Sequence, residues 1–158
     1  MKFASPKILS KKTRCEIFAC LVRPVIEYAA AVYEHMLNGD LSEDIERMQR
    51  MSLKTIFGRK VSYESALDQS GLPRMDTRRK KLALEFALKC EENPRYKRWF
   101  PPHPTYDHNV RAPLKYTEMF ASKDRLKNSP VFRMRKILNE HYATEKKLSH
   151  SSNKAGDK

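Results

Sequence analysis

Long apolar runs are missing from this sequence. None approaches the roughly 20 consecutive apolar residues that a membrane-spanning helix requires, and the opening residues MKFASPKILSKK lack the long apolar core of a secretion signal. We therefore expect a soluble or peripheral protein that is not secreted. Cysteine is sparse as well, and Cys15, Cys20 and Cys90 leave at least one thiol unpaired. This favours a reducing, nuclear or cytoplasmic setting over disulfide formation.

Glycine is also scarce, with 4 residues in a chain of 158. Charged residues make up 32% and apolar residues 40% of the sequence, which argues against a sandwich or barrel and favours helices with a highly charged surface. The length fits one domain, or one compact half with a loose tail. We predict a mainly α-helical fold.

Motifs for catalysis and cofactor binding are missing too. The sequence contains no glycine-rich phosphate loop and no Ser/His/Asp or Cys/His arrangement in a supporting context. Cys90, His103 and His108 have the spacing of the second half of a zinc finger, but the first cysteine pair has no counterpart, because Cys15 and Cys20 lie far upstream. We expect no cofactor and no metal, and Cys90 is expected to be a small core residue.

Positive charge is abundant. The formal net charge is +13 and the pI is about 9.8, so the surface should attract polyanions, first of all nucleic acid and second an anionic membrane. The excess is uneven: residues 1–94 hold 17 basic and 13 acidic residues, whereas residues 95–158 hold 15 basic and only 6 acidic ones. Nucleic acid, bound through its phosphate backbone, is therefore the expected partner.

Apolar spacing predicts a long first helix over residues 11–36, with the stripe continuing through Pro24. Because the phase is kept across the proline, we expect one kinked helix, or two nearly collinear helices, buried along one side. Glu16, Arg23, Glu27 and Glu34 fall on the opposite, polar side. The predicted stripe consists of Phe18, Leu21, Val22, Val25, Ile26, Ala29, Val32, Tyr33 and Met36.

Three further helices should complete a small helical bundle. One begins after Asp40 as N-cap, with Glu43 in a capping box, and ends before Gly58. Its expected stripe is Leu41, Ile45, Met48, Ser52 and Ile56. The next, in VSYESALDQSGLP, is capped by Ser62 and closed by Gly71 and Pro73. The last and longest, in MDTRRKKLALEFALKCEENP, has Asp76 or Thr77 as its cap, with an apolar band of Leu82, Ala83, Phe86, Ala87 and Cys90.

The character of the chain changes after Pro94. The stretch RYKRWFPPHPTYDHNVRAP mixes basic and aromatic residues with prolines and should be extended, irregular chain. A last amphipathic helix is expected in SPVFRMRKILNEHY, with Arg133, Arg135 and Lys136 on its polar side. The remaining polar residues, ATEKKLSHSSNKAGDK, are expected to be disordered.

Taken in order, several blocks of this sequence resemble the carboxy-terminal region of the reverse transcriptase of non-LTR (LINE-type) retrotransposons, particularly the jockey-like elements. The blocks are LVRPVIEYAAAVYE, DIERMQRMSLKTIFG, SYESALDQSGLPRMDTRRKKLALEFALKC and NPRYKRWFPP, followed by HNVRAPLKY and NSPVFRMRKILNEHY. The resemblance covers residues 12–142. It implies thumb-like helices over 11–58 and a helical post-thumb region over 59–94. Composition adds an N-terminal extension over 1–10, a basic and aromatic segment over 95–142 and a disordered tail over 143–158.

The sequence also departs from the family. A reverse transcriptase uses clustered carboxylates, partly from an aromatic-X-Asp-Asp turn, to hold two metal ions, and this chain has no Asp-Asp pair. Glu43, Asp44 and Glu46 lie in the first turns of an expected helix, where carboxylates favour the dipole. We therefore expect no catalytic residues and no polymerase activity in the isolated chain. The abrupt start within a thumb-like helix is expected to reflect a catalytic body that lies upstream or has been lost.

Two basic stretches are the candidate nucleic-acid-binding residues: Arg78, Arg79, Lys80 and Lys81, and then Arg95, Lys97 and Arg98. The first stretch is either a phosphate-contacting face, a nuclear localisation signal or a solvated helix turn. In the second, RYKRWF, the aromatic residues either stack on bases or fold back to plug the bundle. The following prolines favour the plug, and both can hold if the cations face outward.

The sequence leaves three functions open. The leading hypothesis is a non-catalytic remnant that grips phosphates without sequence preference, and the alternative is a small helical protein-interaction domain whose first helix docks on another chain or on itself. A basic peripheral membrane protein is the third and weakest possibility, because the helix polar faces near the start are too acidic.

Overall fold

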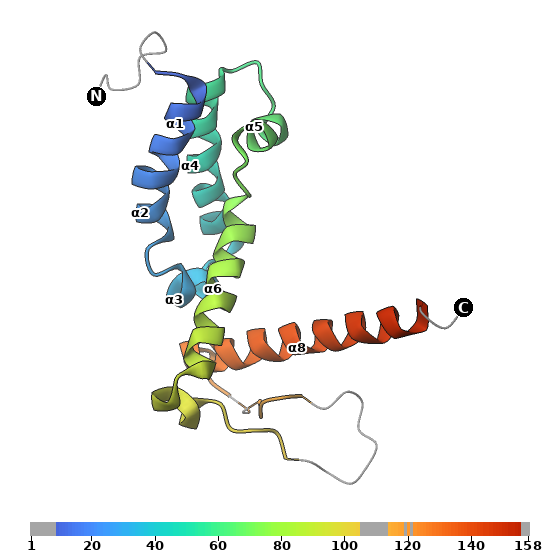
Figure 1. Ribbon diagram of the computed structural model, residues 1–158. Helices are drawn as coiled ribbons and strands as arrows, with labels where there is room; N and C mark the ends of the chain where they lie inside the picture. Colours follow the sequence, from blue (N-terminus) through green and yellow to red (C-terminus); the bar gives the residue numbers. More distant parts are fainter. Residues whose placement is uncertain (1–8, 105–113, 119, 121, 156–158) are drawn as a thin grey trace. The chain divides into compact units, whose positions relative to one another are not determined.

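The computed structural model describes residues 9–104, 114–118, 120 and 122–155, and it confirms a mainly helical chain (Figure 1). The chain divides into two compact units, Met1–Leu82 and Ala83–Lys158. The boundary falls inside helix α6, and each unit has a core of its own. The helices agree with the expected small helical bundle. Of the expected segments, the extension 1–10 lies almost wholly outside the described residues. Within the described part of the chain, no helix is long and apolar enough to cross a membrane.

The first helical run passes Pro24 without interruption. It consists of α1 (Lys11–Ile17), a π-helical turn η1 (Phe18–Val22) and α2 (Arg23–Glu27). In the π-turn the backbone N–H of Arg23 bonds the carbonyl of Phe18, five residues back. A wide turn of this kind makes room for a proline ring that would otherwise collide with the carbonyl four residues earlier. The expected continuation of the helical run through Pro24 is confirmed.

The run ends later, at Tyr28 and Ala29. Tyr28 is extended, and Ala29 has a left-handed backbone with φ 56°, which an alanine rarely adopts. A short helix α3 (Ala30–Tyr33) and a 3₁₀ turn η2 (Glu34–Met36) follow. The prediction of one helix up to residue 36 is therefore wrong beyond Glu27.

The buried face of the first run is not the predicted one. Leu21 and Val25 from the apolar stripe are 67% and 76% exposed, whereas Arg23 from the polar side is 6% exposed. Arg23 pairs with Glu27 (2.7 Å) and donates to the carbonyl of Pro73 (3.2 Å), so an ionic contact turns the polar side inward. Of the stripe, Phe18 is buried.

Helices α4 (Gly39–Phe57) and α5 (Tyr63–Ser70) follow the predicted ranges closely. The caps of α5 are confirmed: the Ser62 hydroxyl accepts from the N–H of Ser65, and Gly71 ends the helix with φ 66°. The cap of α4 is Asn38 rather than Asp40, because the Asn38 side chain reaches the N–H of Leu41 at 2.8 Å. The buried side of α4 also differs from the predicted stripe, and it contains Glu46, Gln49, Leu53 and Ile56.

Helix α6 (Met75–Glu92) begins one residue before the predicted caps. Asp76 and Thr77 therefore lie inside the first turn, and the N–H of Met75 donates to the carboxylate of Glu46 (3.0 Å). A carboxylate from another helix thus replaces the expected local cap. Within the first unit, α4 lies beside α1 and α5 (Figure 1). The core there consists of Cys15, Phe18, Leu53, Ile56 and Ala66.

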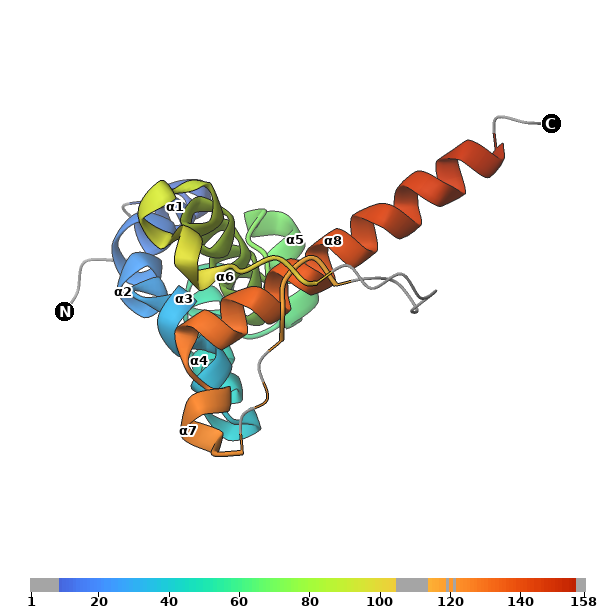
Figure 2. The same cartoon turned by 90° about the horizontal axis from the view of Figure 1, so that it is seen from below.

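The second unit contains the end of α6, a 3₁₀ turn η3 (Pro94–Trp99), α7 (Asp124–Lys127) and α8 (Pro130–Ala155) (Figure 2). An antiparallel bridge joins Pro102 to Tyr116. The buried core consists of Ala87, Cys90, Phe100, Tyr116, Met134 and Leu138, which confirms Cys90 as a core residue. Phe86, predicted in the same band, is 42% exposed.

Two predictions for the second unit are corrected. Residues 94–99 form a helical turn rather than extended chain, and α8 continues through Ala155, so residues 143–155 of the expected disordered tail are helical. The cause is local: no proline or glycine interrupts residues 131–155, and the Nε2 of His141 lies 3.4 Å from a carboxylate oxygen of Glu145, which adds an i,i+4 contact. Residues 156–158 lie outside the described part.

Candidate nucleic-acid interface

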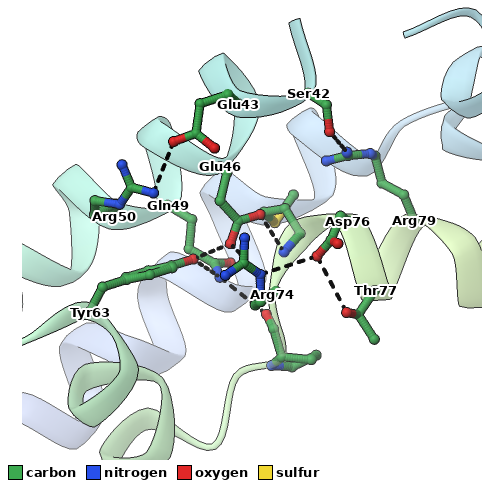
Figure 3. Close-up of polar contacts among 12 residues, drawn as sticks. Ser42, Glu43, Glu46, Gln49, Arg50, Tyr63, Arg74, Asp76, Thr77 and Arg79 are labelled. Atoms are coloured by element: carbon green, nitrogen blue, oxygen red, sulfur yellow. Dashed lines mark hydrogen bonds and ion pairs between the residues drawn. The ribbon is translucent and has the colours of Figure 1, made fainter. Parts of the chain in front are cut away.

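The first basic stretch does not form one cationic surface. Arg78 is half-buried and pairs with Glu27 (Nε to Oε2, 3.4 Å), while Arg79 is only 1% exposed. Its Nη2 donates to the hydroxyl of Ser42 at 2.7 Å (Figure 3). Lys80 and Lys81 are exposed. The side chain of Arg79 is therefore buried, whereas its predicted contact with nucleic acid requires an exposed guanidinium.

Helical spacing explains why Arg79 is buried. Met75, Arg79, Ala83 and Ala87 follow one another at intervals of four and are all at most 3% exposed, so they share the inward face of α6. The guanidinium Nε and Nη1 have no hydrogen-bond partner within the described part of the chain. This spacing of four could have been found in the sequence. It was overlooked because Arg79 stands among the other charged residues of RRKK.

The second basic stretch is arranged differently. Arg95, Lys97 and Arg98 are all exposed on η3, and this 3₁₀ turn contains no acidic residue. In a 3₁₀ helix residues three apart lie on the same side, about 6 Å apart along the axis. Arg95 and Arg98 are therefore aligned, and so are Tyr96 and Trp99. We call Arg95, Lys97 and Arg98 the η3 cations.

The aromatic residues of the stretch fix this turn to the core. The rings of Tyr96 and Trp99 stack with centroids 4.5 Å apart, and Phe100 is 6% exposed with its ring 5.5 Å from that of Tyr116. Trp99 packs against the same core while remaining half-buried. The prediction that the aromatic residues fold back into the core is confirmed for Phe100. The η3 cations face solvent, which is the arrangement that leaves them able to contact phosphates.

A buried arginine that was not predicted also supports η3. Arg135 on α8 was placed on the polar side but is 6% exposed. Its Nε donates to the carbonyl of Trp99 (2.5 Å) and its Nη1 to that of Thr117 (3.3 Å). Burial lowers the pKa of this guanidinium. Arg135 thus holds the end of η3 in place, and no local pattern connects residues 36 positions apart.

Glu91, a carboxylate close to η3 in the sequence, already accepts hydrogen bonds from its own unit. Glu91 accepts hydrogen bonds from Lys115 (2.7 Å), Tyr142 (2.8 Å) and the hydroxyl of Tyr116. Burial raises the pKa of Glu91, but the three donors together lower it below its usual range. Its charge is therefore compensated within the unit, which leaves Glu92 as the exposed carboxylate next to η3.

The cysteines and histidines do not assemble into a metal site among the described residues. Cys15 and Cys90 are buried and Cys20 is exposed; burial raises the pKa of the Cys15 and Cys90 thiols. His108 of the zinc-finger spacing lies outside the described part of the chain. Comparison with family models, curated proteins and solved structures found no match to this chain.

Proposed function

We propose that this protein binds the phosphate backbone of nucleic acid through the η3 cations and carries out no reaction of its own. The observation that supports this most directly is the exposure of Arg95, Lys97 and Arg98 on one turn whose aromatic residues are packed into the core. We further propose that the chain corresponds to the thumb and post-thumb region of a LINE-type reverse transcriptase, on the strength of the ordered sequence blocks.

The physical basis is charge and rigidity. Three cations on one short turn concentrate positive potential, and their backbone is fixed by Phe100 and Arg135, so little conformational freedom is lost when a strand binds. Binding of this kind releases counterions and does not read the base sequence. Lys80 and Lys81 of the first unit are exposed and supply further cations for the same purpose.

Salt-dependent affinity tests the proposal. Binding of a fluorescein-labelled single-stranded oligonucleotide should weaken linearly when log affinity is plotted against log salt, with a slope of about −0.7 per phosphate contact. The triple variant Arg95→Gln, Lys97→Gln, Arg98→Gln should reduce the slope by about 2. Affinity that does not depend on salt would rule the proposal out.

A matched control separates these three positions from total charge. Lys12, Arg59 and Lys60 are exposed residues of the first unit, and changing all three to glutamine removes the same charge. We expect this control variant to keep most of the wild-type slope. Equal losses in both triple variants would mean that net charge, rather than the η3 cations, accounts for binding.

The second candidate function is docking of a protein partner on the first helical run. A groove of about 590 Å³ lies between this run and α4, lined by Ile17, Phe18, Leu21, Val22 and Ile56 among others, and the adjoining Val25 is also exposed. The occupant we propose is an amphipathic helix with acidic flanks, because a net charge of +13 attracts an acidic partner and opposes association with a second copy.

This alternative is tested with a synthetic amphipathic helix that carries leucine on one face and glutamate beside it. The peptide should bind the full chain and lose affinity when Leu21→Gln and Val25→Gln are combined. Both side chains are exposed, so the substitutions should leave the fold intact. Equal peptide binding by wild type and double variant, or a second copy of the chain as the bound species in light scattering, would reject the proposal.

A further inference from the structure

A pocket of about 360 Å³ lies at the beginning of α8, outside the surfaces described so far. Its walls come from α8, from the end of α7 and from Glu118 and Phe120. Volumes of this order are typical of sites for small ligands. Two aromatic rings, Phe120 and Phe132, and several cations line the pocket, and Glu118 is its acidic residue.

The aromatic wall is exposed to an unusual degree. Phe120 is 93% exposed, more than any other large apolar side chain among the described residues. Exposure of a whole phenyl ring is unfavourable in water, and a flat ring at the mouth of a pocket offers a surface on which another flat ring can stack. Phe132, half-buried on α8, lines the same pocket.

The cationic wall supplies donors for an anion. Lys136 is exposed, and Arg133 is held by the side-chain oxygen of Asn128 (Nη2 to Oδ1, 3.0 Å). The Nε of Arg133 is buried and has no hydrogen-bond partner within the described residues. No acidic residue occurs in the first turn of α8, where cations oppose the helix dipole. An anion bound here would relieve that repulsion.

The pocket is also connected to the η3 cations. Arg135 lines it, and the same guanidinium bonds the carbonyls of Trp99, at the end of η3, and of Thr117, next to Glu118. One buried side chain thus fixes both the basic turn and the wall of the pocket. A strand held by the η3 cations and a group in the pocket would therefore contact parts of the same compact unit.

From these contacts we infer that the pocket binds one nucleotide, with the base stacked on Phe120 and Phe132 and the phosphate on Arg133 and Lys136. This inference rests on the proposed nucleic-acid binding and deepens it. Phosphate alone would not use the aromatic wall, and bases inside a duplex are already stacked, so the ligand is a nucleotide of a single strand. A free mononucleotide has the same chemistry and is the second possible source.

The test compares two labelled single-stranded oligonucleotides of equal length, one oligothymidylate and one with abasic sites in its centre, which carries the same phosphates. The full chain should bind oligothymidylate more tightly. Phe120→Ala should weaken that binding by about 5- to 150-fold and leave both the abasic affinity and the salt slope unchanged. Lys136→Gln should lower the slope by about 0.7. Because Phe120 is exposed, folding should be preserved.

Phe86→Ala is the matched control, since Phe86 is an exposed phenylalanine on α6 of the same unit, at 42%. Equal binding of the two oligonucleotides, or equal effects of Phe120→Ala and Phe86→Ala, would overturn the inference while leaving salt-dependent backbone binding intact. Thymidine monophosphate is then added alone. If thymidine monophosphate binds the wild type but not Phe120→Ala, and no oligonucleotide binds, the pocket is supported and the proposed function is rejected. If none of these probes binds, both are rejected.

Discussion

Glu46 on α4 accepts a hydrogen bond from the backbone N–H of Met75, the first residue of α6, with Oε2 3.0 Å from the nitrogen (Figure 3). The same carboxylate accepts from the hydroxyl of Tyr63 on α5 (2.5 Å) and pairs with Arg74 (3.7 Å). Its side chain is 3% exposed. One buried carboxylate therefore holds three helices of the first unit together, and it does so by satisfying a helix N-terminus.

Replacement of this carboxylate should destabilise the first unit. Glu46→Gln keeps the size of the side chain but presents an amide group to two donors, so a buried donor is left unsatisfied. We expect a loss of about 1–3 kcal/mol in the free energy of unfolding. Urea unfolding followed by far-UV circular dichroism measures the difference.

Glu43 provides the matched control on the same helix. Its carboxylate pairs with Arg50 at 2.9 Å but is half exposed, and such pairs contribute about 1 kcal/mol or less. Glu43→Gln should therefore have a clearly smaller effect. If the two glutamine variants unfold at the same urea concentration, Glu46 does not have the role assigned to it.

Local signals in the sequence predicted the helices well, because caps and breakers act over a few residues. Ser62 and Gly71 bound α5 as expected. The contact from Glu46 to Met75 spans 29 positions, and no local pattern reveals it. Periodicity likewise identified the first helix but not its buried face, since that depends on the ion pair that Arg23 makes with Glu27.

Tyr63 should make the first unit sensitive to alkali. Burial, and after it the hydrogen bond to Glu46, raise the pKa of Tyr63 to about 12, against about 10 for an ordinary tyrosine. The folded protein holds this proton more tightly, so the contribution is complete below pH 10 and is lost as the pH rises toward 12. Tyr63→Phe should flatten the fall in unfolding free energy between pH 10 and 12. Parallel curves for wild type and variant would contradict this.

The second unit should be sensitive to acid through Glu91. Burial raises the pKa of this carboxyl, but the donors Lys115, Tyr116 and Tyr142 lower it further, and its net pKa lies below the ordinary value. A carboxylate with a lowered pKa stabilises the fold above the unfolded value of about 4.3, and this stabilisation disappears as the pH falls through the folded value. Unfolding of the second unit should thus become easier below about pH 4.

Glu91→Gln should cost about 1–3 kcal/mol at pH 7 and should remove part of the further loss on acidification. Trp99 is the single tryptophan and lies in the second unit, so its fluorescence during urea titration reports on this unit directly. Glu92→Gln, at the exposed neighbouring position, should change stability by less than about 0.5 kcal/mol. An unaltered acid response in Glu91→Gln would refute the assignment.

The candidate site, like the fold, could be predicted from the sequence only where local signals determine it. The prolines after Phe100 correctly indicated that this ring turns back into the core, because they act locally. The burial of Arg79 followed a spacing of four that the surrounding charges concealed. The pocket at the start of α8 brings Phe120 and Arg133 together, and that meeting depends on how the chain packs rather than on any motif.

Ala29 offers a route to a more stable first unit. Its φ of 56° and ψ of 20° are left-handed, which costs an alanine about 1–2 kcal/mol and a glycine almost nothing. The gain from Ala29→Gly is reduced by about 0.4–1 kcal/mol, because glycine adds freedom to the unfolded chain. A net increase of about 0.5–1 kcal/mol in unfolding free energy should remain. Ala31→Gly, within helix α3, should instead lower the unfolding free energy by about 1 kcal/mol. If urea titrations show that both glycine variants are destabilised equally, the backbone at Ala29 is not strained.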